Sequence, residues 1–367
     1  MRSSRLTILI IAVLIACLGI LSIYSSVYHK EGRVWQEIYK RQILWVFFGL
    51  VCFLAMANLN YRFLWDFTYV LYGIALFFLF LVFVLGITRL GAQRWLKIAW
   101  FNFQPSEFAK LIVVIFLAKY FSRKSSYDLS LPVSRFGIVQ GVIVPFLFVA
   151  VPMGLIIEQP DLGSGMIIML IFITMLYAAE VKLKHILVLL AVLCAPMPIF
   201  WHFLRDYQKE RLLVFLNPNI DPLGAGYTVI QSKIAIGSGW LWGKGWLSGT
   251  QSQLHFLPES HTDFIFATFA EEWGFLGCVA LLALYYCIIR QGFRIAERTH
   301  DNFGRLLASG ISLMLSIQIF VNIAMNMGLA PVVGVPLPLM SYGGSSVLVT
   351  FIALGILANI DRTRAVF

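Results

Sequence analysis

The sequence predicts an all-α integral membrane protein with about ten transmembrane helices, and three observations lead to this class. Hydrophobic residues make up 60% of the chain and charged residues only 13%, whereas soluble domains have far more charge. Apolar runs of about 20 residues, the helical length that crosses a bilayer core, recur along the chain. Basic residues gather in the short segments between these runs.

The apolar runs define ten predicted spans. Each must be a helix, because backbone polar groups inside a bilayer have to be satisfied within the protein. The first run is too long for the apolar part of a signal peptide and lacks a cleavage site, so we expect it to be retained. We find no internal repeat and treat 1–367 as one domain. The spans are 6–27, 43–58, 68–87, 107–121, 136–157, 162–179, 184–204, 264–289, 306–327 and 343–360.

Lysine and arginine predict the orientation, because short cytoplasmic loops carry an excess of both. A cytoplasmic N-terminus puts 14 basic residues in short inner segments: Arg2, Arg5, Arg62, Arg123, Lys124, Arg135, Lys182, Lys184, Arg290, Arg294, Arg298, Arg305, Arg362 and Arg364. It puts 7 in short outer loops: Lys30, Arg33, Lys40, Arg41, Arg89, Arg94 and Lys97. Both termini are therefore predicted to be cytoplasmic.

The net charge of +10 would suggest nucleic acid binding in a soluble protein. Here the charge lies between apolar runs, where topology and anionic lipid explain it, so no nucleic-acid partner is expected. The five cysteines lie inside apolar runs without paired spacing, which argues against a disulfide framework or a zinc site.

One connection is much longer than the others. Residues 205–263 join the seventh and eighth spans on the outer side, and connections of this length are usually functional. Glycine, proline, tryptophan and short apolar stretches within it predict that it folds against the membrane surface. The outer connection at 328–342 is rich in proline and glycine.

A pair of opposite charges lies inside the fourth predicted span. Glu107 and Lys110 are three residues apart on one helical face and can form an ion pair. They follow Gln104-Pro105-Ser106, in which Pro105 can open the helix and Ser106 can cap it. Charges within a membrane helix usually face a cavity and serve a function, but a structural ion pair explains the spacing equally well.

Two aspartates lie where outer loops enter predicted helices. Asp161 is most simply the N-cap of the sixth helix. Asp263 is either the N-cap of the helix starting at Phe264, which the sequence alone slightly favours, or a general base beside cationic residues. Glu271 and Glu272 are adjacent in the eighth span, so at most one of them is expected to face a cavity.

Basic residues near these carboxylates are compatible with an anionic substrate. Solvated surface charge explains most of them, but together with Lys110 they can line a cavity for a lipid-linked diphosphate. They are Arg94, Lys97, Arg205, Lys209, Arg211, Lys233 and Lys244. The histidines show no ligand spacing, and a hard divalent ion held by carboxylates needs no special motif.

Motifs spread over nearly the whole chain resemble those of the SEDS family (shape, elongation, division and sporulation). They are GAQRW at 91–95, FQPSE at 103–107, QPDLG at 159–163, DPLGAGY at 221–227, IQSKIAIGSG at 230–239, HTDFIF at 261–266, PLP at 336–338 and SYGGS at 341–345. The stretch GKGWLSGTQSQL at 243–254 resembles the elongation branch of the family rather than the division branch.

This resemblance implies a peptidoglycan glycosyltransferase of the bacterial cytoplasmic (inner) membrane, which polymerises lipid II into β-1,4 glycan strands at the outer face for cell elongation and rod shape. It implies a class B penicillin-binding protein and other elongation-complex membrane proteins as partners. It also implies a catalytic role for Asp263, a central cavity containing Glu107 and Lys110, and support by Mg or Mn, with Asp161 and Asp263 as expected ligands and no organic cofactor.

The expected mechanism needs one base. A glycosidase uses two carboxylates, but a lipid diphosphate is already a good leaving group and requires cations rather than an acid. Asp263 would take the proton of the acceptor's GlcNAc 4-hydroxyl as it attacks the MurNAc anomeric carbon, with inversion. The residues expected to bind substrate are Glu107, Lys110, Arg94, Asp161, Gln208, Arg211, Lys233, Lys244, His261 and Thr262.

Two other functions stay open. A lipid II flippase would suit many helices and an intramembrane ion pair, although we see neither repeated halves nor clearly broken midplane helices. A non-catalytic scaffold would not need Asp263, Glu107 and Lys110. Small residues of the eighth and ninth helices predict an outer surface for a partner's membrane helix: Ala267, Ala270, Gly274, Gly277, Ala308 and Gly310.

Overall fold

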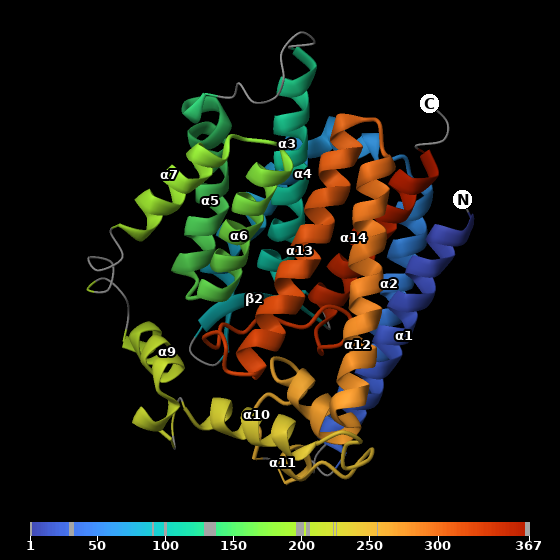
Figure 1. Cartoon of the computed structure of the whole chain (residues 1–367), viewed down its shortest axis with the longest axis vertical. Helices are drawn as coiled ribbons and strands as arrows, with labels where there is room; N and C mark the ends of the chain where they lie inside the picture. Colours follow the sequence, from blue (N-terminus) through green and yellow to red (C-terminus); the bar gives the residue numbers. More distant parts are fainter. Residues whose placement is uncertain are drawn as a thin grey trace.

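The computed structural model describes residues 2–28, 33–89, 92–98, 101–127, 137–195, 202, 206–222, 224, 226–254 and 256–363. Long helices form one bundle, as Figure 1 shows. They are α1 (Arg2–Val27), α2 (Arg33–Asn58), α3 (Arg62–Leu85), α4 (Pro105–Tyr127), α5 (Val144–Glu158) after the π-helical turn η2 (Val139–Ile143), α6 (Leu162–Ala178), α7 (Leu183–Cys194), α12 (Ile265–Arg298), α13 (Asn302–Asn326) and α14 (Gly344–Thr363).

The bundle has the outer surface of a membrane protein. In the described part of the chain, seven helices are long and apolar enough to cross a membrane by length and composition: α1, α2, α3, η2 with α5, α12, α13 and α14. Large apolar side chains such as Phe77, Phe80 and Val84 point away from the protein, as lipid-facing side chains do. The prediction of a mostly helical, multi-pass membrane protein is confirmed.

The two ends of the bundle differ. At one end, the Asn58 side chain accepts hydrogen bonds from Arg5 at 3.4 Å and Arg362 at 2.9 Å, so the first and last helices meet there. At the other end, short helices lie across the bundle (Figure 1). They are α9 (Asp206–Leu216), η3 (Pro218–Ile220), α10 (Tyr227–Ser238) and α11 (Thr250–Gln253).

A small antiparallel sheet joins α3 to α4. Its strands β1 (Ile87–Arg89), β2 (Ala92–Ile98) and β3 (Phe101–Phe103) are hydrogen-bonded in sequence order. The sequence analysis missed this sheet, because such short strands carry too few residues for an alternating pattern to stand out. The sheet brings Arg94 of β2 toward the start of α4 and α6.

Helix α12 is interrupted at Gly274, whose φ of 63° and ψ of −164° are not helical. Only glycine adopts this backbone conformation without strain. The groups freed by the break bond to the loop between α10 and α11: the Glu271 carbonyl accepts from the Lys244 N–H at 3.0 Å, and the Phe275 N–H donates to the Trp240 carbonyl at 2.7 Å. The loop therefore replaces the helical hydrogen bonds that the break removes.

Most of the small residues predicted to meet a partner helix lie inside the chain. A Cβ at Gly274 would come within 2.3 Å of the Gly243 nitrogen, and only Gly277 of the set is partly exposed. The buried remainder are Ala267, Ala270, Ala308 and Gly310. The predicted outer surface is therefore wrong for all of them except Gly277, because these positions pack against the protein's own elements.

Candidate active site

Asp161 is the centre of a polar network at the start of α6. Its Oδ1 accepts a hydrogen bond from the Ser164 N–H at 3.2 Å, so it caps the helix as the sequence suggested. Its Oδ2 accepts from Gln104 Nε2 at 3.5 Å and from Ser106 Oγ at 3.4 Å. Ser106, expected to cap α4, instead donates to this carboxylate, and both Asp161 oxygens are occupied by the protein.

Arg94 reaches this network from β2. Its Nη1 lies 3.8 Å from Asp161 Oδ1, and its Nη2 donates to the Pro160 carbonyl. The Arg94 side chain is 20% exposed whereas that of Asp161 is 2% exposed. The guanidinium therefore covers a buried carboxylate while part of its own surface stays open to a ligand.

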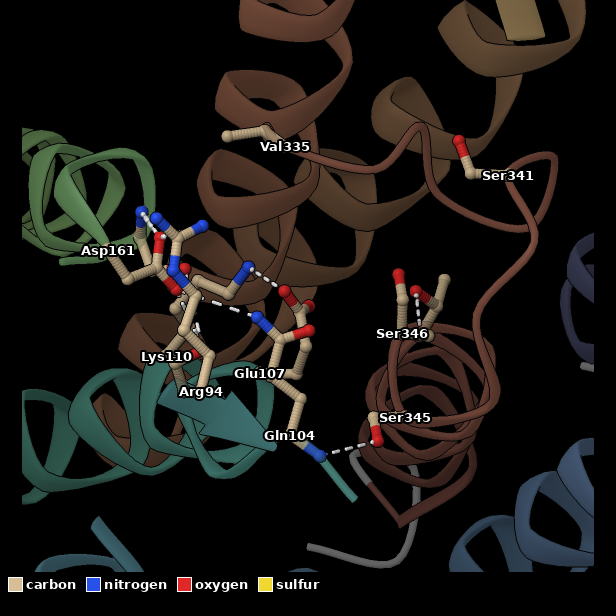
Figure 2. Close-up of polar contacts among 12 residues, drawn as sticks. Arg94, Gln104, Glu107, Lys110, Asp161, Val335, Ser341, Ser345 and Ser346 are labelled. Carbon is tan, nitrogen blue, oxygen red and sulfur yellow. Dashed lines mark hydrogen bonds and ion pairs between the residues drawn. The ribbon is translucent and has the colours of Figure 1, made fainter. Parts of the chain in front are cut away.

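Glu107 and Lys110 form the ion pair that their spacing predicted. Lys110 Nζ lies 2.7 Å from Glu107 Oε1, and both side chains are almost completely buried. Figure 2 shows the pair next to Arg94 and Asp161, beneath the segment that carries Val335. A buried pair of this kind is stable only while both partners are present, because a lone buried charge is costly.

Asp263 lies just before α12 and does not cap it. The N-cap residue is Phe264, which makes no side-chain cap hydrogen bond, so the interpretation that the sequence slightly favoured is wrong. The Ala267 N–H of the first turn donates instead to Asn326 Oδ1 at 3.2 Å. No described residue donates a hydrogen bond to the Asp263 carboxylate, which lies opposite Gly334: a Cβ there would be 3.4 Å from Oδ2.

The surroundings of Asp263 suit proton transfer near neutral pH. Burial raises the pKa of Asp263 to about 6, the Glu259 carboxylate adds to the rise, and Arg211 and Arg94 oppose it. A general base works best when its pKa lies near the operating pH. The same two arginines provide positive charge beside the carboxylate.

Arg211 projects from α9 toward the loop before α14. Its Nη1 donates to the Val332 carbonyl at 3.0 Å, and it lines a small, mostly apolar cavity with Val229 of α10. Gln208 is buried in the same helix, and Lys233 of the neighbouring α10 packs against Gly328. Arg211 is thus the residue of this group that acts electrostatically on Asp263.

Lys244 has a partner away from this group. Its Nζ lies 2.8 Å from Glu271 Oε1, and the same Glu271 oxygen accepts the Gln251 N–H at 3.0 Å. The neighbouring Glu272 turns to α1 and accepts a hydrogen bond from Ser25 Oγ. Both carboxylates are buried and hold the outer loop to the bundle.

His261 and Thr262 support the chain around Asp263. The buried His261 ring packs edge-on against Trp35, with ring centroids 5.6 Å apart, and its carbonyl accepts the Tyr342 N–H. Thr262 Oγ1 donates to Glu259 at 3.1 Å. These contacts fix the loop that carries Asp263. A role of His261 and Thr262 in substrate binding stays a prediction.

Sequence reasoning missed Asn322, Asn326 and Gly334 near Asp263. A signal for the asparagines was present, because two amides one helical turn apart in an otherwise apolar membrane helix have to find partners inside the protein. Gly334 gave no such signal among the glycines of its loop. Its φ of 68° is a feature of the folded chain alone.

The predicted metal ligands fit an ion only in part. Among the described residues, no three His, Cys, Asp or Glu side chains are grouped closely enough to hold a metal. Asp161 does not fit, because both its oxygens accept hydrogen bonds from the protein and Arg94 lies beside it. Asp263 fits better, because Mg²⁺ is commonly bound by one or two carboxylates together with substrate phosphates and water.

Comparison with known proteins gives long matches. A family model for FtsW, RodA and SpoVE, described as cell cycle proteins, matches residues 5–366. The peptidoglycan glycosyltransferase MrdB of Escherichia coli (strain K12) is 42% identical over 359 residues, which cover 98% of this chain and 93% of that protein. The probable peptidoglycan glycosyltransferase FtsW of Geobacter sp. (strain M18) is 34% identical, covering 96% and 95%.

Solved structures agree with these matches. A chain from work on the structural coordination of polymerization and crosslinking by a peptidoglycan synthase complex has a TM-score of 0.81 at 31% identity, covering 97% of both chains. The rod shape determining protein RodA of Thermus thermophilus has a TM-score of 0.70 at 29% identity, covering 97% of this chain and 96% of that one.

Proposed function

The chain belongs to the FtsW/RodA/SpoVE family of cell cycle proteins, and on that premise we propose that it polymerises lipid II with Asp263 as its general base. It is a peptidoglycan glycosyltransferase, the activity for which its relatives are named. It makes β-1,4 glycan strands at the outer face of the bacterial cytoplasmic membrane, for cell elongation and rod shape.

The assignment of Asp263 as the base rests on one observation: its carboxylate has no structural role in the described part of the chain. No described residue hydrogen-bonds to its carboxylate, and burial raises its pKa to about 6. The neighbouring Asp161 is bound on both oxygens. A carboxylate that is ionised near neutral pH and free to accept a proton has the properties of a general base.

The reaction follows from these groups. Asp263 accepts the proton of the acceptor's GlcNAc 4-hydroxyl while that oxygen bonds to the anomeric carbon of the donor's MurNAc. The bond from that carbon to the diphosphate oxygen breaks, and the lipid diphosphate leaves with the electron pair. Arg94, Arg211 and Lys110 stabilise the charge that develops on it, and Glu107, 2.7 Å from Lys110 Nζ, orients Lys110.

The proposal includes a divalent cation only as an ion bound jointly by Asp263 and the substrate. Asp263 would hold Mg or Mn, which would supply positive charge to the substrate's diphosphate when bound. The proposed proton transfer and bond changes require the residues above and do not depend on that ion.

We propose ten spans with both termini in the cytoplasm, since α4, α6 and α7 added to the seven long apolar helices make ten. The meeting of Arg5 and Arg362 at Asn58 supports this arrangement, as does the position of α9 to α11 at the far end. Cysteine labelling should find position 244 accessible from outside and position 294 from inside. Labelling of both from one side would overturn the topology.

We propose a class B penicillin-binding protein as partner, along with other membrane proteins of the elongation complex. The similarity to a chain of a peptidoglycan synthase complex supports this choice. Exposed Phe275, Leu276 and Val279 on α12, next to Gly277, offer an apolar face for the partner's membrane helix.

Purified protein with lipid II and the partner tests the function. Glycan strands on a gel of labelled product should appear, and should require both this chain and lipid II. Movement of lipid II across vesicle membranes without strand formation would favour a flippase. Strands made equally well when Asp263→Asn replaces the wild type would favour a scaffold, with the polymerase located in another component of the mixture.

A further inference from the structure

Two fully buried asparagines of α13 hold the main chain of Asp263. Asn322 and Asn326 are one helical turn apart, and both are 0% exposed. Their Nδ2 groups donate to the Asp263 carbonyl at 3.1 Å and 2.9 Å, respectively. Burying an amide is unfavourable if its hydrogen bonds are lost, so both side chains depend on these partners.

The same two amides tie Asp263 to its neighbours. Asn322 Nδ2 also donates to the Val335 carbonyl at 2.7 Å, and Asn326 Oδ1 accepts the Ala267 N–H of α12 at 3.2 Å. Asn326 Nδ2 contacts the Asn322 carbonyl as well, at 2.9 Å. One clamp therefore joins α13, the loop with Val335, the loop with Asp263 and the first turn of α12.

The contact with Ala267 bears on the chemistry. An aspartate just before a helix ordinarily accepts one of the first helical N–H groups. A carboxylate engaged in that way would have less capacity for the substrate's proton. In this chain Asn326 Oδ1 accepts the Ala267 N–H, which also donates to the Phe264 carbonyl at 3.1 Å, and the Asp263 carboxylate faces Gly334.

We propose that Asn322 and Asn326 are positioning residues for the glycosyl transfer. They fix the Asp263 main chain, and Asn326 also binds the first turn of α12, so that the carboxylate is correctly placed to act as the base. This inference rests on the proposed function of Asp263. It assigns Asn322 and Asn326 an effect on the turnover rate. Buried amides with a purely structural role would affect only stability.

Asn359 supplies a matched control. It is also 0% exposed, and its side chain makes two main-chain hydrogen bonds, to the Ala57 carbonyl at 3.1 Å and from the Tyr61 N–H at 3.0 Å. These contacts lie at the end of the bundle where Asn58 meets the terminal helices. Asn359→Ala therefore removes an equally buried amide far from Asp263.

The experiment measures kcat, KM for lipid II and the melting temperature of the full chain with its partner. We expect Asn322→Ala and Asn326→Ala each to lower kcat about 10-fold and the double variant about 100-fold, because misplacing a reacting group by about 1 Å can cost that much. KM should stay within about twofold, since neither amide touches substrate. Asn359→Ala should lower the melting temperature similarly and leave kcat within about twofold.

The inference is overturned if the clamp variants turn over as fast as Asn359→Ala, or if their loss appears in KM rather than kcat. If the alanine variants aggregate, Asn322→Ser and Asn326→Ser replace them, with the same expected split. Asp263→Asn is assayed alongside: wild-type turnover by that variant would refute the base itself. Loss of activity in Asp263→Asn with full activity in the clamp variants would refute only the clamp.

Discussion

Asp161 and Asp263 are the same residue type in the same setting, directly before an apolar helix, yet their side chains have different contacts. Asp161 caps α6 and binds Gln104 and Ser106. Asp263 does not cap α12, and no described residue donates a hydrogen bond to its carboxylate, while Asn322 and Asn326 hold its main chain. The difference teaches that a candidate reactive carboxylate can be recognised by the absence of a structural role for its side chain.

The largest expected effect is that of Asp263→Asn. The amide keeps the shape of the side chain and cannot accept the proton, and general-base catalysis is worth about 100- to 10,000-fold. We expect a loss of this size in a gel of labelled glycan, with normal melting and partner binding. Long strands at the wild-type rate from the folded variant would abolish the contrast with Asp161.

The Glu107–Lys110 pair comes next. Lys110→Ala leaves a buried carboxylate alone, which can cost about 3–5 kcal/mol of stability, and removes a cation from the diphosphate. We expect glycan synthesis to fall more than the amount of folded protein.

The double variant Glu107→Gln with Lys110→Met separates these two effects. It removes both charges together, so stability should largely return, while activity should remain at least about 10-fold low because the cation is missing. Recovery of full activity by the neutral pair would assign Lys110 to the fold alone.

A pH series gives a graded test. Since the pKa of Asp263 is raised to about 6, kcat should fall about tenfold for each pH unit below that value, as the base becomes protonated. The sign for stability is opposite. The folded state favours the protonated form, so this contribution is complete below the ordinary pKa of 3.8 and is lost as pH rises through about 6.

It follows that Asp263→Asn should melt no lower than the wild type at pH 7.5, measured in the same detergent. A rate that is flat from pH 5 to 8 would argue for a base elsewhere.

Asp161→Asn should have the smallest effect. Asparagine caps helices about as well as aspartate, so the variant should keep the α6 cap and lose mainly the ion pair with Arg94. We expect a few-fold change in kcat and a stability loss of about 1 kcal/mol or less, since partly exposed pairs contribute little. A loss as large as that of Asp263→Asn would make the two aspartates equivalent.

Much of the architecture was predictable because it follows from local patterns. Apolar runs marked the helices, the three-residue spacing marked the Glu107–Lys110 pair, and the position of Asp161 marked a cap. These features depend on residues within one or two helical turns of each other. The family motifs then indicated a catalytic role for Asp263, whereas the local sequence alone slightly favoured a helix N-cap.

The remaining features depend on distant partners. The Asp263 main chain is held by Asn326, 63 residues later in the chain. Arg94 meets Asp161 because a sheet of short strands carries it there. The break at Gly274 depends on a loop about 30 residues earlier, and nothing in its own apolar run signals it.

The break at Gly274 also determines the length of the continuous helix in α12. An unbroken helix of the 34 residues of α12 would be about 51 Å long at 1.5 Å per residue, whereas the hydrocarbon core of a bilayer is about 30 Å thick. The part after Gly274, from Phe275 to Arg298, would be about 36 Å long, which a modest tilt accommodates. Gly274 thus divides one apolar run into a portion whose length matches the membrane and a short portion, residues 265–273, that directly follows Asp263 in the chain.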